Sequence, residues 1–332
     1  MMPKFAYARP KSVEEALKLL SPPGSVVHAG GTDLLGCLRD RVHEAETVVS
    51  LTQLSELRGI QKAADGGLHI GALTTITEVA ESPLVNGLYP GLAKAAPEVA
   101  SPQLRNQGTI GGNLCQKPRC WYYRGEFHCL RKGGDTCYAV AGENEFHCIF
   151  GGDSCFIVHP SDTAPVLVAL EATVEIVGQK GMRKVPAGNF FVPPSKDPQR
   201  ETVLEQGELV TGISLPPPAT GLHSSYRKVR ARQSWDFALA GVALALVMDN
   251  DKVTKARVVL GGAAPVPWRS LEVEKVITGR KLDAATIRLA SEAVIQGAKQ
   301  MDQNAYKLPL FRGVIEEELI AITAQTSLSK SS

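Results

Sequence analysis

Apolar and polar positions along the first hundred residues predict short strands alternating with short helices. Ser12 and Glu15 form a capping-box pair, so a helix is expected to open there and run through Leu20. The β-branched runs VVH and TVVSL predict two strands, and the helix between them should begin at Thr32 or Asp33. The stretch LHIGALTTITEVA predicts a strand that turns into a helix, and GLAKAAPEVA predicts another helix.

The second half of the chain has longer apolar runs. PSDTAPVLVALEATVEIVG predicts a turn, an apolar helix and a strand, and GELVTGISLPPP predicts a strand that ends at the prolines of 216–218. YRKVRARQSWDFALAGVALALVM and KARVVLGGAAPVPWR predict further strands, and amphipathic helices are expected at 284–299 and 308–324. Strands followed by helices predict an α+β unit with helices on one face of an antiparallel sheet.

These patterns divide the chain into three expected units, which a length of 332 residues can support. The first unit spans 1–58 and the second spans 59–218, with a cysteine-rich loop at 115–155 inside it. The third unit spans 219–332 and follows the proline-rich stretch.

Composition and charge exclude several function classes. The 36 Lys and Arg residues nearly balance 34 Asp and Glu residues and form no long basic run, which argues against nucleic-acid binding. The longest apolar run, FALAGVALALVM, is too short to span a bilayer, so no membrane insertion is expected. The first residues lack the apolar core of a signal peptide, which makes a cytoplasmic location the default.

The cysteines are the most unusual feature, because six of the seven fall between 115 and 155. An odd count and a reducing compartment favour metal binding over disulfides. The chain has no C-x2-C pair of the kind that structural zinc sites use, whereas an iron–sulfur cluster needs four cysteines and tolerates varied spacing. The spacing alone leaves iron–sulfur and zinc both open.

Two double-glycine turns, AGGTD at 29–33 and TIGGN at 109–113, are candidate phosphate-binding loops. Successive N–H groups of such turns can surround a phosphate, although a glycine pair is also common in turns that bind nothing. The chain has no G-x-G-x-x-G motif, so a Rossmann site is not supported. We also find no Ser-His-Asp set, no H-E-x-x-H motif and no defensible acid–base carboxylate pair, and therefore predict no catalytic residue.

Four motifs in a fixed order carry a resemblance that covers essentially the whole chain. AGGTDLL, QLRNQGTIGGNLCQ, HPSDTAPVLVAL and YRKVRARQSWDFALAGVAL resemble the FAD-binding subunit of molybdenum hydroxylases, the xanthine dehydrogenase family. The resemblance implies a two-part FAD-binding domain of the vanillyl-alcohol-oxidase type followed by an α+β C-terminal domain. A cysteine loop between TIGGN and PSD is typical of the subgroup with 4-hydroxybenzoyl-CoA reductase and aldehyde oxidoreductases, where it holds an extra [4Fe–4S] cluster. The motifs look closer to the aldehyde oxidoreductase branch.

The resemblance also implies individual site residues. The FAD-binding residues would be Ala29, Gly30, Gly31, Thr32, Asp33, Leu34, Arg105, Asn106, Thr109, Gly111, Gly112, Asn113, Ser161, Asp162 and Lys228. The two glycine loops would bind the diphosphate, Asp162 would approach the ribityl or diphosphate region with Ser161 beside it, and Lys228 would lie near the isoalloxazine edge. The cluster ligands would be Cys120, Cys129, Cys137 and Cys155, with Cys148 left open as a replacement for Cys155.

The implied function is electron transfer within a heterotrimer. Partners would be a large molybdopterin-binding subunit, a small [2Fe–2S] subunit and an external electron acceptor, and a signal-bearing partner could carry the folded complex to the periplasm. Two other classes stay open: a self-contained FAD oxidase of the vanillyl-alcohol-oxidase type, and a zinc-binding scaffold whose glycine loops are plain turns.

Overall fold

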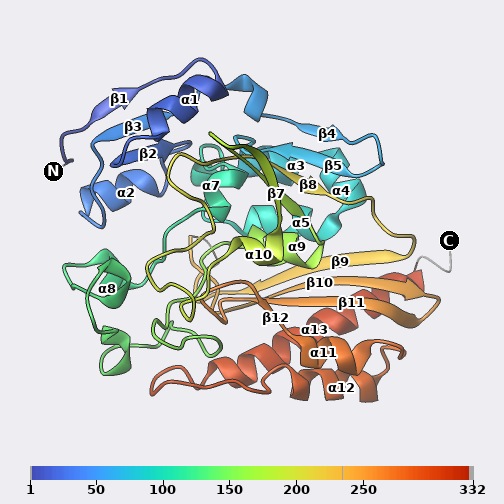
Figure 1. The fold of residues 1–332 in the computed structure, drawn as a ribbon. Helices are drawn as coiled ribbons and strands as arrows, with labels where there is room; N and C mark the ends of the chain where they lie inside the picture. The colour runs from blue at the N-terminus through green and yellow to red at the C-terminus, as the bar shows by residue number, and fades with distance from the viewer. Residues whose placement is uncertain (1, 234, 329–332) are drawn as a thin grey trace.

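The computed structural model describes residues 2–233 and 235–328, which form three sheets with helices packed around them (Figure 1). The first sheet is small and parallel, with the order β1 (Ala6–Ala8), β3 (Thr47–Ser50), β2 (Ser25–His28). The helices α1 (Val13–Leu20) and α2 (Leu34–Arg39) connect these strands. The expected helix at 12–20 is confirmed, and the Ser12 hydroxyl accepts a hydrogen bond from the Glu15 N–H as its cap.

The second sheet is antiparallel and has five strands. Its order is β4 (Ile60–Lys62), β5 (Leu68–Gly71), β8 (Leu209–Leu215), β6 (Thr173–Gly178), β7 (Gly181–Pro186). The helices of this region are α3 (Ile76–Glu81), α4 (Pro83–Leu88), α5 (Pro90–Ala95), α9 (Thr163–Ala169) and α10 (Ala187–Phe190), with 3₁₀ turns at Ser55–Leu57 and Ala96–Glu98. Their apolar side chains join those of the sheet in one core.

The third sheet is antiparallel and contains β9 (Leu222–Val229), β10 (Ala240–Asp249), β11 (Lys252–Gly261) and β12 (Trp268–Arg269). The helices α11 (Leu271–Ile277), α12 (Ala284–Ala293) and α13 (Lys307–Leu328) cover one face, as expected (Figure 1). The other face packs on α5 and α9. Both faces of β10 are therefore buried, which explains its continuous apolar sequence.

One helix prediction for this last region needs correction, and one helix was missed. The helix expected at 284–299 ends at Ala293, and α11 was not predicted. The seven residues of α11 follow directly on a short strand, so their apolar pattern is too brief to stand out from a strand-rich neighbourhood.

The cysteine-rich loop leads away from the second region after α6 (Pro102–Arg105) and α7 (Ile110–Leu114). It contains α8 (Trp121–Arg124) and 3₁₀ turns at Leu130–Lys132 and Tyr138–Val140. Side-chain bonds fix its end to the chain before α13: Asn144 and Gln303 each donate a backbone N–H to the other's side chain at 3.0 Å. Within the described part of the chain, no helix is long and apolar enough to cross a membrane.

Candidate functional site

The two glycine loops line one pocket, although they lie about eighty residues apart in the chain. The pocket has a cavity volume of about 430 Å³. The first loop follows β2 and supplies residues 29–34, and the second contributes Thr109, Gly111 and Gly112 around the start of α7. A further wall comes from Gln199, Arg200, Glu201, Thr202 and Leu204 and from β8, so segments far apart in the sequence enclose the space.

Glycine is required in the first loop for two different reasons. A Cβ atom at Gly30 would lie 1.8 Å from the carbonyl oxygen of Gln107, so this loop touches the backbone that precedes the second loop. Gly31 has φ of +72°, a conformation that other residues adopt only with strain. The glycine pair thus allows the two loops to meet at one edge of the pocket.

The first loop also presents unpaired hydrogen-bond donors. Among the residues that the structure describes, none accepts a hydrogen bond from the backbone N–H groups of Gly30, Gly31, Thr32 or Asp33. Since a folded chain pairs almost all of its backbone polar groups, a run of four such donors at a pocket is suited to a ligand with several acceptor oxygens.

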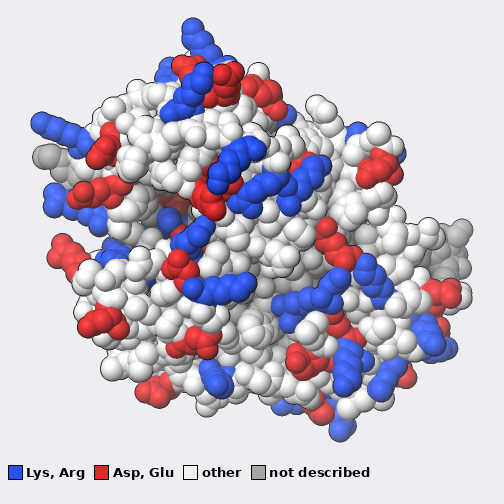
Figure 2. Space-filling model, viewed as in Figure 1, with Lys and Arg blue, Asp and Glu red and all other residues white. Residues whose placement is uncertain are grey.

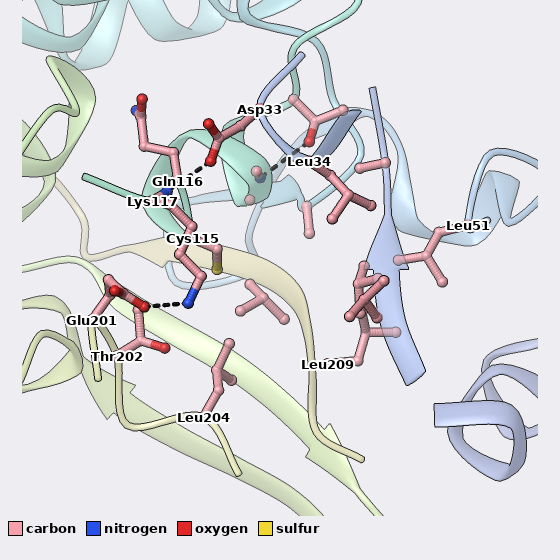
Figure 3. Close-up of a pocket in the computed structure, with 18 of the residues that line it drawn as sticks. Asp33, Leu34, Leu51, Cys115, Gln116, Lys117, Glu201, Thr202, Leu204 and Leu209 are labelled. Atoms are coloured by element: carbon pink, nitrogen blue, oxygen red, sulfur yellow. Dashed lines mark hydrogen bonds and ion pairs between the residues drawn. The ribbon is translucent and has the colours of Figure 1, made fainter. Parts of the chain in front are cut away.

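Charged side chains close the pocket on the side of the cysteine-rich loop. Lys117 lies between two carboxylates: its backbone N–H donates to Asp33 Oδ2 at 2.7 Å, and its ammonium group donates to the Glu201 carboxylate (Figure 3). Asp33 also accepts from Arg124 at 2.7 Å and forms an ion pair with Arg119 at 3.0 Å. Burial opposes ionisation of Asp33, but the two guanidinium groups outweigh it and lower the pKa of the carboxyl group. The pocket therefore carries fixed charges of both signs.

A second, smaller cavity lies inside the cysteine-rich loop. Four of its lining residues are Cys120, Cys129, Cys137 and Cys155. The thiols are free, and the residues around them are the aromatic side chains Tyr122, Tyr123 and Tyr138 together with His147 and Arg131. Cys148 is 1 % exposed and is not among the lining residues.

Hydrogen-bond donors surround the sulfur atoms of this cavity. Backbone N–H groups of Tyr122 and Tyr123 are directed at the thiol of Cys120, and those of Phe156 and Ala139 are directed at Cys137. His147 Nε2 lies 3.4 Å from Cys120 Sγ. Burial raises the pKa of the Cys120 thiol to about 11.

The donor set of this cavity suits a thiolate-bound cluster. Four cysteines line one space, backbone N–H groups are directed at the thiols of Cys120 and Cys137, and the buried guanidinium of Arg131 interacts electrostatically with Cys155. The four cysteines thus supply the residue types that a cluster needs without forming a ready metal site: over residues 2–233 and 235–328, no group of three or more His, Cys, Asp or Glu side chains is arranged to hold a metal ion.

Comparison with known proteins identifies the family to which the fold belongs. A family model described as the FAD-binding domain in molybdopterin dehydrogenase matches residues 3–218, and one described as the CO dehydrogenase flavoprotein C-terminal domain matches residues 224–315. The chain belongs to the FAD-binding subunits of the molybdenum hydroxylase family. Among the relatives of this FAD-binding subunit is the aldehyde oxidoreductase FAD-binding subunit PaoB of Escherichia coli, 35 % identical over 98 % of this chain and all of that one.

Other relatives of the FAD-binding subunit carry the names of enzymes for different substrates. The putative xanthine dehydrogenase FAD-binding subunit XdhB of Escherichia coli is 30 % identical over 88 % of this chain and 85 % of its own length. A solved carbon monoxide dehydrogenase from Hydrogenophaga pseudoflava has a chain that is 27 % identical, with a TM-score of 0.76 and 96 % coverage of both chains. The family is therefore an oxidoreductase family with one shared flavoprotein fold.

Some of the residues predicted for FAD line the pocket of this FAD-binding subunit, and others lie outside its lining. Residues 29–34 and Thr109, Gly111 and Gly112 line the pocket. Asn113 lies behind it, where its Oδ1 accepts from Ser161 Oγ at 2.5 Å and from Thr163 Oγ1 at 2.7 Å. Arg105 and Asn106 bond elsewhere, to the Val99 carbonyl oxygen and to Thr77 respectively, so they support the approach to the second loop.

Asp162 and Lys228 lie together, outside the residues that line the pocket. Lys228 Nζ is 2.8 Å from Asp162 Oδ2, with side-chain exposures of 0 % and 6 %. Tyr226 Oη donates to the other carboxylate oxygen at 2.8 Å, and Lys228 also donates to the Glu98 carbonyl oxygen. Burial raises the pKa of the Asp162 carboxyl group in spite of its cationic partner. This pair joins β9 to the start of α9, next to Ser161.

Sequence reasoning missed several residues of the pocket. Gln116 and Lys117 line it directly after the second glycine loop, and their position beside the motif was the available signal. Glu201 and Arg200 come from an irregular segment between α10 and β8, where no sequence pattern marks a site.

Proposed function

We propose that the chain is the FAD-carrying electron-transfer subunit of a heterotrimeric molybdenum hydroxylase that oxidises aldehydes. The observation that carries the proposal is the meeting of both glycine loops, with unpaired N–H groups and Lys117, on one pocket. The similarity to the aldehyde oxidoreductase FAD-binding subunit supports the substrate class. The partners would be a large molybdopterin-binding subunit and a small [2Fe–2S] subunit.

The proposed task of the pocket is to hold and orient the flavin nucleotide. The N–H groups of residues 30–33 would donate to diphosphate oxygens, and the second loop would hold the same group from the other side. Bound FAD would supply the redox chemistry, taking electrons from the partner centres and passing them to an external acceptor. Asp162 and Lys228 would support the pocket indirectly. Their ion pair would fix the segment of Ser161, whose hydroxyl group donates to Asn113.

The four thiols of the second cavity would hold the extra [4Fe–4S] cluster. Cys120, Cys129, Cys137 and Cys155 meet the requirement for four sulfur ligands, and the tyrosines around them would limit access of water. Arg131, which lines the same cavity, would offset negative charge at Cys155. The cluster would add one further redox centre to those of the partner subunits.

The first experiment is a count of flavin, iron, acid-labile sulfide and zinc on the complex purified without oxygen. The proposal expects one FAD and about four irons per copy of this chain beyond the irons of the [2Fe–2S] partner. FAD with zinc and no extra iron would refute the cluster and retain the flavin site. Absence of flavin from the folded complex would refute the whole proposal.

A pair of cysteine substitutions tests the ligand set. Cys155→Ser removes a thiol that lines the cavity, so the extra iron should fall to a small fraction of the wild-type content. Cys148→Ser is the matched control, because this buried thiol does not line the cavity and its loss should leave the iron content near the wild-type value. The opposite pattern would make Cys148 the fourth ligand.

The substrate class and compartment have their own tests. The complex should oxidise aromatic and aliphatic aldehydes, and preferential turnover of purines or an aromatic CoA thioester would replace the aldehyde assignment. We place the complex in the cytoplasm, with export beside a signal-bearing partner as the alternative, and cell fractionation decides between them.

A further inference from the structure

One carboxylate, that of Glu201, connects the two cavities. Its Oε2 accepts from the ammonium group of Lys117, which lines the glycine-loop pocket. Its Oε1 accepts from Arg131 Nη1 at 2.8 Å, and Arg131 lines the cavity of the four thiols. A continuous series of polar contacts therefore runs from the pocket through Lys117 and Glu201 to Arg131, which lines the same cavity as Cys155 and interacts with it electrostatically.

The position of Glu201 is set by a segment that belongs to neither cavity motif. It lies between α10 and β8, and its carbonyl oxygen accepts from the Val192 N–H at 3.0 Å. The next residue, Thr202, pairs with Phe191 in an isolated β-bridge. The carboxylate is thus held from the backbone of a third element, and the two cations reach it from one loop.

Burial strengthens the electrostatic interactions of Arg131 and Glu201. The Arg131 side chain is 2 % exposed and that of Glu201 is 10 % exposed, whereas Lys117 is 36 % exposed at the pocket side. Charges that are shielded from water interact over longer distances than charges on the surface, because the surrounding dielectric is lower. One anion therefore acts on both cavities.

We propose that Glu201 is a positioning residue that couples the two cofactor sites electrostatically, by holding Arg131 at the cluster and Lys117 at the flavin. This inference rests on the proposed function, since it requires FAD in the pocket and a cluster between the thiols. Removing the negative charge leaves both cations uncompensated. Because a more positive surrounding favours the reduced form of each centre, both midpoint potentials should rise together.

The test is a potentiometric titration of the intact complex, with the flavin followed by absorbance and the cluster by electron paramagnetic resonance. Glu201→Gln should shift both midpoint potentials to more positive values. Glu205→Gln is the matched control, because Glu205 is an exposed carboxylate in the same segment and lines neither cavity. Its midpoint potentials should equal those of the wild type.

A second variant keeps the inference testable if Glu201→Gln does not fold. Lys117→Met removes a cation and leaves the carboxylate to Arg131 alone, so both midpoint potentials should shift to more negative values. A shift of only one centre in either variant, or of neither, would overturn the coupling. A wild-type complex that lacks flavin or extra iron would instead refute the proposed function, so the two failures are distinguishable.

Discussion

The buried ion pair of Lys228 and Asp162 allows a quantitative test of how the C-terminal sheet is joined to the flavin region. Tyr226 and Lys228 are two residues apart on β9, so both side chains point to the same face and reach the Asp162 carboxylate. Lys228→Met removes the cation and leaves the carboxylate buried with one hydrogen bond. Breaking a buried pair in this way costs about 3–5 kcal/mol of folding stability.

The decisive comparison adds Asp162→Asn to each background. In the wild type this change leaves Lys228 charged and unpaired, so stability should fall. In the Lys228→Met variant it removes the uncompensated charge and keeps an acceptor for Tyr226. The remaining cost is one lost hydrogen bond to the Glu98 carbonyl oxygen, about 0.5–1.5 kcal/mol, because Arg230 still donates to that oxygen at 3.4 Å. Asp162→Asn should therefore restore about 3 kcal/mol in that background.

Urea denaturation of the purified chain, followed by tryptophan fluorescence, measures these differences in the free energy of unfolding. The comparison holds when the variants have the same dependence of that free energy on urea concentration. Lys255→Met is the control, because its ion pair with Glu171 is exposed on the same sheet and should contribute less than about 1 kcal/mol. If Asp162→Asn lowers stability equally in both backgrounds, the two side chains are not coupled and the reasoning fails.

Three further predictions follow from single positions. Gly30→Ala should cost most of the bound flavin, because its Cβ meets the Gln107 carbonyl oxygen, whereas Gly36→Ala, with nothing within 4 Å, should retain it. Asp33→Asn should lower stability at neutral pH and converge with the wild type in thermal melts at acid pH, since the contribution of a carboxyl group with a lowered pKa is lost as pH falls through that pKa. Burial lowers the pKa of Lys307 to about 8, so wild-type stability should rise between about pH 8 and pH 10, and Lys307→Met should abolish the rise.

Each of these predictions has a contrary result. Equal flavin retention in Gly30→Ala and Gly36→Ala would mean that the two loops do not need close contact. A constant stability difference between the wild type and Asp33→Asn at all pH values would separate Asp33 from its arginine partners. A Lys307→Met protein that keeps the alkaline rise would assign that rise to another group.

Sequence patterns predicted the helices and strands correctly where the interactions that stabilise an element lie within that element. Ser12 caps α1, and the β-branched residues of β2 and β3 form strands, because these preferences act within a few residues. The N-cap at Asp33 was also foreseen, yet its carboxylate makes no capping bond. It is engaged by Arg119 and Arg124, whose approach depends on the fold of a loop about ninety residues later.

The pocket shows the same limit. Its glycine loops were recognisable because the chain must bend tightly and approach itself there, which only glycine permits. The residues next to Glu201 in the sequence show no comparable pattern. Its position between Lys117 and Arg131 depends on how segments far apart in the sequence pack together. The basic and acidic side chains visible on the face in Figure 2 are interspersed, which agrees with the absence of basic runs in the sequence.

The cysteines show how tertiary contacts separate residues that the sequence alone does not distinguish, because four of the six clustered cysteines line the second cavity. Spacing alone gives Cys148 and Cys155 the same standing, since both follow Cys137 through an irregular stretch. In the folded chain, Asn304 donates from its side chain to the carbonyl oxygens of His147 and Cys148 at 3.1 and 3.2 Å, which fixes this segment against the C-terminal region. His147 then reaches the thiol cavity while Cys148 packs outside its lining. A substitution of Asn304 should therefore loosen this segment and lower the iron content without removing a thiol, and an unchanged iron content in Asn304→Ala would show that the cavity forms without this contact.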